Sequence, residues 1–254
     1  MSKLGSEPQD EKRDTGSHIT FVWALGGYLL LFLALNAVIN ISIDPYLRFG
    51  SKRVQAWNDV KPAVLSQVRM AKAYEVQRGH FKTLLLGNSR VDVGLDPVSK
   101  SIPDDCQPVY NLAQPGTGTD ATLVYLKHAC AYYPPTRVVI GVDFMNFLRL
   151  PDDHDRSMQE RTTEGLPAGN DLAVARLQGQ PWERCKQQAK DALTAGLSLS
   201  AISDSVRTLG AQRNRYSPNM TDRGFNAGEA FRTLIADEGQ LALFDQKNRE
   251  YADR

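Results

Sequence analysis

The sequence predicts an α/β fold: an open parallel sheet with flanking helices, preceded by one N-terminal transmembrane helix. Short apolar runs that end at glycine or polar residues alternate with segments of helical periodicity, which is typical of parallel strands joined by crossover helices. A single long uncharged segment precedes this pattern. The length of 254 residues suits one large domain with appendages.

The composition favours no charged partner. Lys and Arg together number 30 and Asp and Glu 29, so the formal net charge is +1. A nearly neutral chain has no long-range field toward nucleic acid, and we expect no nucleic-acid partner. The cysteines Cys106, Cys130 and Cys185 lack the paired spacing of a zinc site. We therefore expect no metal ion and no cofactor, while free thiols and a Cys106–Cys130 disulfide both remain open.

The segment from Ile19 to Ile43 contains no charged residue. A helix needs about 20 apolar residues, at about 1.5 Å each, to cross the hydrocarbon core of a bilayer. The stretch is too long for an ordinary signal sequence and lacks an A-x-A cleavage pattern. We predict a retained transmembrane helix over residues 19–43, rather than a cleaved signal or a buried core helix. Asn36 and Asn40 share one face of it, either as a polar seam for a partner helix or as the interfacial end of the span.

Polar segments flank the predicted membrane helix. Residues 1–18 have too little apolar surface to fold, and we predict a disordered tail. Residues 44–60 are predicted to form a juxtamembrane linker, with Tyr46, Phe49 and Trp57 at the headgroup level. Basic residues occur on both sides of the apolar stretch, so the positive-inside rule does not decide which end is cytoplasmic.

Residues 61–254 are predicted to form the α/β domain. We expect strands near residues 82–88, 108–113 and 137–144. We expect helices near residues 61–78, 121–133, 181–195, 198–213 and 226–238. The end of the chain offers at most a weak strand at 241–244, so the predicted sheet is incomplete and we expect a chain that is truncated at its C-terminus.

Three residues closely follow the three predicted strands: Ser89, Gly116 and Asp143. The carboxyl ends of parallel strands meet at one edge of a sheet, where ligands bind in open α/β folds. We therefore predict that the three positions converge on one rim. A serine at such a place is either a nucleophile or a residue that caps the next turn, and the pattern leaves both readings open.

Three segments, LLLGNSRVDVGLDP, VYNLAQPGTGTDATLVYLKHA and RVVIGVDFMNF, resemble in order and spacing those of membrane-anchored SGNH/GDSL-like hydrolase-fold proteins of the bacterial cell envelope. The likeness extends over residues 44–228. It implies an SGNH-type, flavodoxin-like sheet, in which Ser89 is the nucleophile and its backbone N–H helps to hold the oxyanion. It also implies that the Gly116 N–H points into the oxyanion hole. Such donors stabilise the charge that develops in a tetrahedral intermediate.

The third segment departs from the pattern of this family. Members of the Gly-x-Asn-Asp form carry an asparagine two residues after the glycine, whereas Asp143 follows Gly141 here. A carboxylate would repel an oxyanion, so we interpret Asp143 as a structural or orienting residue and Asn146 as a weak substitute donor to substrate. Arg90 either clamps a carboxylate or phosphate of the substrate or forms a salt bridge with Asp92 or Asp143.

The Asp-x-x-His of the family, which supplies its catalytic base, is missing. None of the four histidines, His18, His80, His128 and His154, lies in such a motif. Only His154 follows the third strand onto the predicted rim, where it is a base, a metal ligand or part of a solvated acidic loop. A serine hydroxyl is a poor nucleophile without an oriented base, so we expect the chain as given to be inert toward acyl esters.

The resemblance implies a membrane-anchored esterase or O-acyltransferase that acts on a cell-envelope glycan or exopolysaccharide through an acyl-enzyme on Ser89. Its partners would be the lipid bilayer and a polysaccharide or acyl donor. Residues 1–18 would then lie in the cytoplasm and the domain outside the inner (plasma) membrane. The alternative is a non-catalytic member of the same fold that binds glycan or scaffolds an envelope assembly.

Overall fold

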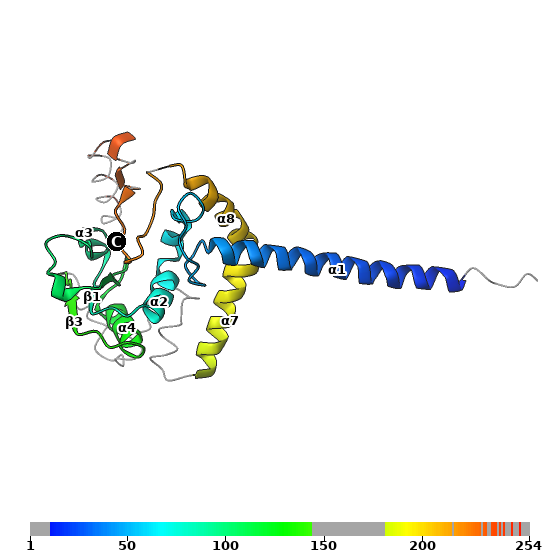
Figure 1. The fold of residues 1–254 in the computed structure, drawn as a ribbon, viewed down its shortest axis with the longest axis horizontal. Coiled ribbons are helices and arrows are strands. Elements are labelled where there is room, and N and C mark those ends of the chain that lie inside the picture. The colour runs from blue at the N-terminus through cyan, green and yellow to red at the C-terminus, as the bar shows by residue number, and fades with distance from the viewer. Residues whose placement is uncertain are drawn as a thin grey trace, which may run out of the picture.

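The computed structural model describes residues 11–143, 181–214 and 216–229, together with scattered positions between 231 and 249. In these residues a small domain of mixed α/β structure stands at one end of a long helix, α1 (Glu11–Ile43), which projects away from it (Figure 1). The domain contains a parallel sheet of three strands in the order β2-β1-β3. The predicted α/β class with an open parallel sheet is therefore confirmed.

The strands are shorter than predicted but lie within the predicted ranges. They are β1 (Thr83–Leu86), β2 (Val109–Asn111) and β3 (Arg137–Ile140). The central strand β1 is buried along its whole length, whereas β3, at the sheet edge, is exposed. A parallel strand that is buried on both faces consists mainly of consecutive apolar residues, so the run TLLL predicted β1 from the sequence.

Helices cover the two faces of β1 differently. Leu84 and Leu86 share the largest core cluster with residues of α2 (Val68–Arg78) and α4 (Thr119–Cys130). Leu85 points to the other face and packs with Val91 of α3 (Ser89–Gly94), a helix that was not predicted. Two 3-10 helices complete this part: η1 (Pro62–Gln67), which forms the first half of the predicted 61–78 helix, and η2 (Asp104–Cys106).

Helix α1 is longer than the apolar stretch that predicted it. It begins at Glu11, so residues 11–18 are helical and the predicted disordered tail is wrong for them. A helix that has been nucleated extends at little cost through residues such as Glu, Lys and Arg. From His18 to Ile43 it is long and apolar enough to cross a membrane, and only 6% of its most apolar window is buried, so it is not a core helix.

Residues 44–60 fold against the domain instead of forming the predicted linker. Tyr46 and Leu47 are buried in core clusters. Asp44 adopts a φ of 51°, and its carboxylate accepts hydrogen bonds from the backbone N–H groups of Arg48 and Gly50 at 2.8 Å and of Ser51 at 3.1 Å. The carboxylate thereby organises the turn that follows α1.

Two buried side chains cap the carbonyl end of α1. Lys61 is inaccessible to solvent, and its Nζ donates to the carbonyl oxygens of Ile43 and Asp44. Asn58 donates to the carbonyl of Ser42 at 3.2 Å. Burial lowers the pKa of Lys61 to about 8. These groups satisfy carbonyls that a helix end would otherwise leave unpaired.

The last turns of α1 pack against α7 (Pro181–Leu197) and α8 (Leu199–Ala211), which match the helices predicted at 181–195 and 198–213. Asn40 is fully buried between them: its Nδ2 donates to the Gly196 carbonyl at 2.9 Å, and its Oδ1 accepts from the Ser205 hydroxyl at 2.7 Å. Of the two readings of this asparagine, the polar seam is the one observed.

The C-terminal region is helical at residues 229, 231, 232 and 235–237, within the predicted 226–238 helix. Leu241 is also helical, so the weak strand predicted at 241–244 is not formed there. The other positions of that strand lie outside the described residues.

Replacing Asp44 with alanine should destabilise the junction, because several buried N–H groups would lose their acceptor. We expect Asp44→Ala to lower the free energy of unfolding of the full chain in detergent by about 3 kcal/mol. Asp44→Asn, which keeps one acceptor oxygen, should lower it less. Near-ultraviolet circular dichroism against denaturant would measure both. The control is the exposed Asp59→Ala, and an equal loss in that variant would contradict this role of Asp44.

Candidate functional site

The loops that follow the three strands meet at one edge of the sheet. Leu85 pairs with Asn111, and Leu86 pairs with Ile140, in parallel register. The Gln114 N–H donates to the Gly87 carbonyl at 2.9 Å, and the Gly141 N–H donates to the Leu86 carbonyl at 2.8 Å. The positions of Ser89, Gly116 and Asp143 therefore lie at the same rim, just after the three strands.

Ser89 is the first residue of α3, directly after a sharp turn from β1. Gly87 has a φ of 148°, and a Cβ there would meet Val91 at 2.6 Å and the Gly141 carbonyl oxygen at 2.8 Å, so only glycine fits. Asn88 is the N-cap, since its side chain accepts from the Arg90 N–H at 3.0 Å. Ser89 is exposed, and neither its N–H nor its hydroxyl has a hydrogen-bond partner among the described residues.

Gly116 lies in the loop between β2 and α4. It is exposed and has a φ of 68°, a conformation that favours glycine, although a Cβ would meet nothing within 4 Å. Its N–H has no acceptor within the described part of the chain. The Thr117 hydroxyl donates to the Gln114 carbonyl at 2.8 Å and so closes the loop. The rim thus offers two unengaged backbone donors, at Ser89 and Gly116.

Asp143 is held by two side chains from the start of α3. Its carboxylate accepts from Nδ2 of Asn88 and forms an ion pair with Arg90. Of the readings open for Arg90, the structure contains the salt bridge to Asp143, while Arg90 itself is 76% exposed. The pair links the loop after β3 to the loop after β1, which agrees with an orienting role for Asp143.

The described histidines lie away from this rim. His128 is buried in α4, with its Nε2 at 3.0 Å from the Ala73 carbonyl oxygen of α2. His80 precedes β1 and contacts Tyr133 in a tilted arrangement, with ring centroids 3.6 Å apart. His18 is part of α1. The two remaining candidates, His154 and Asn146, lie outside the described residues.

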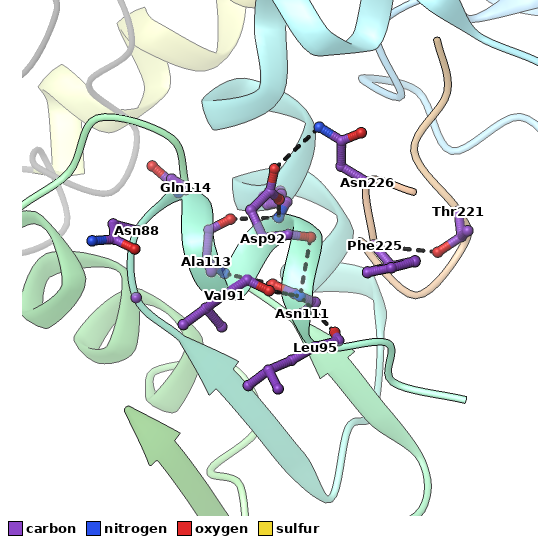
Figure 2. Close-up of polar contacts among 12 residues, drawn as sticks. Asn88, Val91, Asp92, Leu95, Asn111, Ala113, Gln114, Thr221, Phe225 and Asn226 are labelled. Carbon is purple, nitrogen blue, oxygen red and sulfur yellow. Dashed lines mark hydrogen bonds and ion pairs between the residues drawn. The ribbon is translucent and has the colours of Figure 1, made fainter. Parts of the chain in front are cut away.

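A buried ion pair lies directly beneath α3. Nζ of Lys72 contacts Oδ1 of Asp92 at 2.6 Å, and both side chains are at most 1% exposed. Lys72 also donates to the Ala113 carbonyl. Figure 2 shows Asn226 donating to the second Asp92 oxygen, at 3.3 Å. Burial lowers the pKa of Lys72, and the Asp92 charge opposes this shift.

The side chain of Asn111 connects strand β2 to the same helix, α3. Its Nδ2 donates to the carbonyls of Val91 at 2.8 Å and Leu95 at 3.0 Å, at the C-terminal end of α3 (Figure 2). The Asn111 N–H in turn donates to the Arg223 carbonyl at 2.8 Å. The helix that begins with Ser89 is therefore attached to α2, β2 and the segment around residues 223–226.

Sequence reasoning missed these supporting residues. Asn88 was recognisable, because asparagine just before a short helical segment is a frequent N-cap. Lys72 and Asp92 carried no such signal: each stands among apolar residues of a helix, and their pairing joins segments far apart in the sequence. The three cysteines are all free, so the Cys106–Cys130 disulfide is not formed.

Comparisons with protein-family models, with characterised proteins and with solved structures found no match for this chain. The chemistry of the rim therefore has to be inferred from its own geometry.

Breaking the buried pair should cost far more than breaking the exposed one. We expect Lys72→Met and Asp92→Asn each to lower the free energy of unfolding by about 3–5 kcal/mol, since each leaves a buried partner uncompensated. The double variant should lose clearly less than the sum of the two. Arg90→Gln, which breaks the exposed pair with Asp143, should cost less than about 1 kcal/mol. Additive losses in a double-mutant cycle, measured by denaturant unfolding of the full chain, would contradict the coupling.

Proposed function

We propose that this protein is a membrane-anchored, SGNH-like esterase or O-acyltransferase that forms an acyl-enzyme on Ser89. The observation that carries the proposal is the presentation of the serine. Its hydroxyl is exposed and unengaged among the described residues, directly after the central strand, on the same rim as the free N–H groups of Ser89 and Gly116. Two donors at such a place can stabilise an oxyanion.

The catalytic step needs a base that removes the hydroxyl proton as Ser89 attacks an acyl carbonyl. Among the described histidines, His128 is buried against α2, His80 precedes β1 and His18 lies in α1, so none of them is placed to act as this base. Arg90 and Asp143 then act as a pair that keeps the two flanking loops in register. The substrate that the sequence resemblance implies is an acylated envelope glycan or exopolysaccharide.

The second candidate is a non-catalytic glycan-binding or scaffold protein of the envelope. It is favoured by the carboxylate of Asp143, which stands where the family pattern supplies an oxyanion donor and is engaged by Arg90 and Asn88. A rim without an activating histidine can still bind hydroxyl groups through its exposed polar side chains and free N–H groups.

A fluorophosphonate probe separates the two candidates. Without an oriented base we expect negligible acetyl-ester turnover by the full chain, but a slow adduct that forms selectively on Ser89 because the two N–H groups stabilise the oxyanion. The adduct, mapped by mass spectrometry, should vanish in Ser89→Ala and persist in the control Ser101→Ala, a change of an exposed serine.

His154→Ala should leave the rate of adduct formation unchanged, and a loss of about 100-fold or more would identify His154 as the base. Labelling that shows no preference for Ser89 over other serines would contradict the acyl-enzyme and favour the binding function.

The anchoring part of the proposal places α1 across the inner (plasma) membrane, with residues 1–18 in the cytoplasm and the domain outside. The support is the length and apolar character of α1 and its exposure along residues 19–35. Protease added to intact spheroplasts should digest the domain and leave a protected fragment of α1. Protection of the domain until the membrane is lysed would reverse the orientation.

A further inference from the structure

Helix α7 has polar side chains on its buried face and large apolar side chains among its exposed residues. Its inward face carries Gln187 and Asp191, which are buried and linked by a hydrogen bond of 2.7 Å, and Asp191 also accepts from the Tyr74 hydroxyl at 2.8 Å. Its outward face carries Trp182, which is 74% exposed, and Leu193, which is 59% exposed. In a soluble domain the apolar stripe faces the core and the polar face meets water.

Helix α8 repeats this arrangement. Ser205 and Thr208 are fully buried, and Ser205 donates to Asn40 of α1. Leu199 and Val206 lie two turns apart on the opposite face and are 77% and 64% exposed. Two consecutive helices therefore expose large apolar side chains, while their buried faces combine polar side chains with small residues such as Ala195 and Ala201.

The position of these helices along α1 indicates what they face. Both pack against the last turns of α1, at Asn40, and they run across its direction on the side of the domain from which α1 projects (Figure 1). The freely exposed part of α1, residues 19–35, is about 25 Å long at about 1.5 Å per residue, close to the hydrocarbon thickness of a bilayer. When α1 spans a membrane, α7 and α8 consequently lie where the hydrocarbon core meets the headgroups.

We propose that α7 and α8 form a platform that lies on the lipid surface, with Trp182, Leu193, Leu199 and Val206 inserted among the headgroups. The proposal rests on the membrane-spanning role of α1 proposed above. Both helices pack against the last turns of α1, next to its exposed apolar part, so one neighbour, the phospholipid, can cover both surfaces. Tryptophan is favoured at this depth because its ring is apolar and its N–H is polar.

An exposed lysine on α7 is compatible with a lipid partner. Lys186 has a side chain that is 67% exposed, follows Trp182 by about one helical turn and forms an ion pair with Glu183 at 3.5 Å. A lysine beside an inserted apolar face can extend its ammonium group to lipid phosphates while its methylene stem stays in the interface. The platform fixes the tilt of the domain on the membrane and keeps α3, which lies on the far side of the domain (Figure 1), away from the lipid.

The three native tryptophans allow a direct test in the full chain, because Trp23 lies in α1 and Trp182 on the platform. Trp57→Phe with Trp182→Phe leaves Trp23, and Trp23→Phe with Trp57→Phe leaves Trp182. Each protein is reconstituted in phosphatidylcholine vesicles whose acyl chains are brominated near the headgroup or near the chain end. We expect Trp182 to lose about half of its fluorescence with the shallow bromines and clearly less with the deep ones.

A matched control places Val98→Trp in a chain in which all three native tryptophans are phenylalanine. Val98 is 63% exposed in the loop after α3, and a tryptophan there should show no quenching. A further variant, Leu193→Glu with Leu199→Glu, should reduce the quenching of Trp182 severalfold and leave Trp23 quenched.

The outcomes separate the platform from the anchor. Trp23 without quenching would overturn the membrane span itself. Quenched Trp23 with unquenched Trp182 would overturn the platform while the span stands. If Trp182 is unquenched and Leu199→Cys, in a chain whose three native cysteines are replaced by serine, forms disulfide-linked dimers in vesicles, the face is instead an interface between two copies of the chain.

Discussion

The buried ion pair of Lys72 and Asp92 is the constraint on which the arrangement of the candidate site depends. Two buried opposite charges are stable only when each lies close to the other and makes further hydrogen bonds. Here the Ala113 carbonyl accepts from Lys72, and Asn226 donates to Asp92. This pairing ties α3 to α2 and to the loop that follows β2. Because Ser89 is the first residue of α3, the geometry that satisfies the charges also determines where the serine is presented.

A second set of buried polar groups joins α1 to the domain. The carbonyl end of α1 is satisfied by Lys61 and Asn58, and the following turn is organised by the carboxylate of Asp44. Unpaired backbone groups are costly in a buried place, so these contacts resist bending between the helix and the domain. The consequence is a stiff connection, in which the orientation of α1 and the orientation of the domain are coupled.

The exposed apolar surface and the candidate site lie at different ends of the molecule. At one end α1, α7 and α8 share the seam at Asn40 and expose apolar side chains, while α3 and the rim lie at the other end (Figure 1). The acyl transfer to a large glycan proposed above would need access from the aqueous side. The arrangement agrees with that need, because the apolar surface and the rim lie on different faces of the molecule.

Local patterns in the sequence predicted those elements whose structure depends mainly on residues adjacent in the chain. The uncharged run 19–43 predicted the apolar part of α1, and the short apolar runs predicted the strands. Gly87 marked a turn that only glycine can make, and Gly116 marked a turn that favours glycine. Hydrophobic periodicity and backbone sterics act within a few residues, so they can be read directly from the chain. The start of α1 at Glu11 and the packed segment 44–60 could not be read this way, because helix extension and tertiary contacts override composition.

Only the tertiary structure decided which polar residues pair and which faces remain outward. Lys72 meets Asp92, Asn40 meets Ser205, and Tyr74 meets Asp191 across long separations in the sequence. An amphipathic pattern shows that α7 and α8 each have two unlike faces, but it does not tell which face is buried. That choice depends on the partners which each face finds, here the polar groups of α1 and α2, and it left Trp182 and Leu199 on the outside.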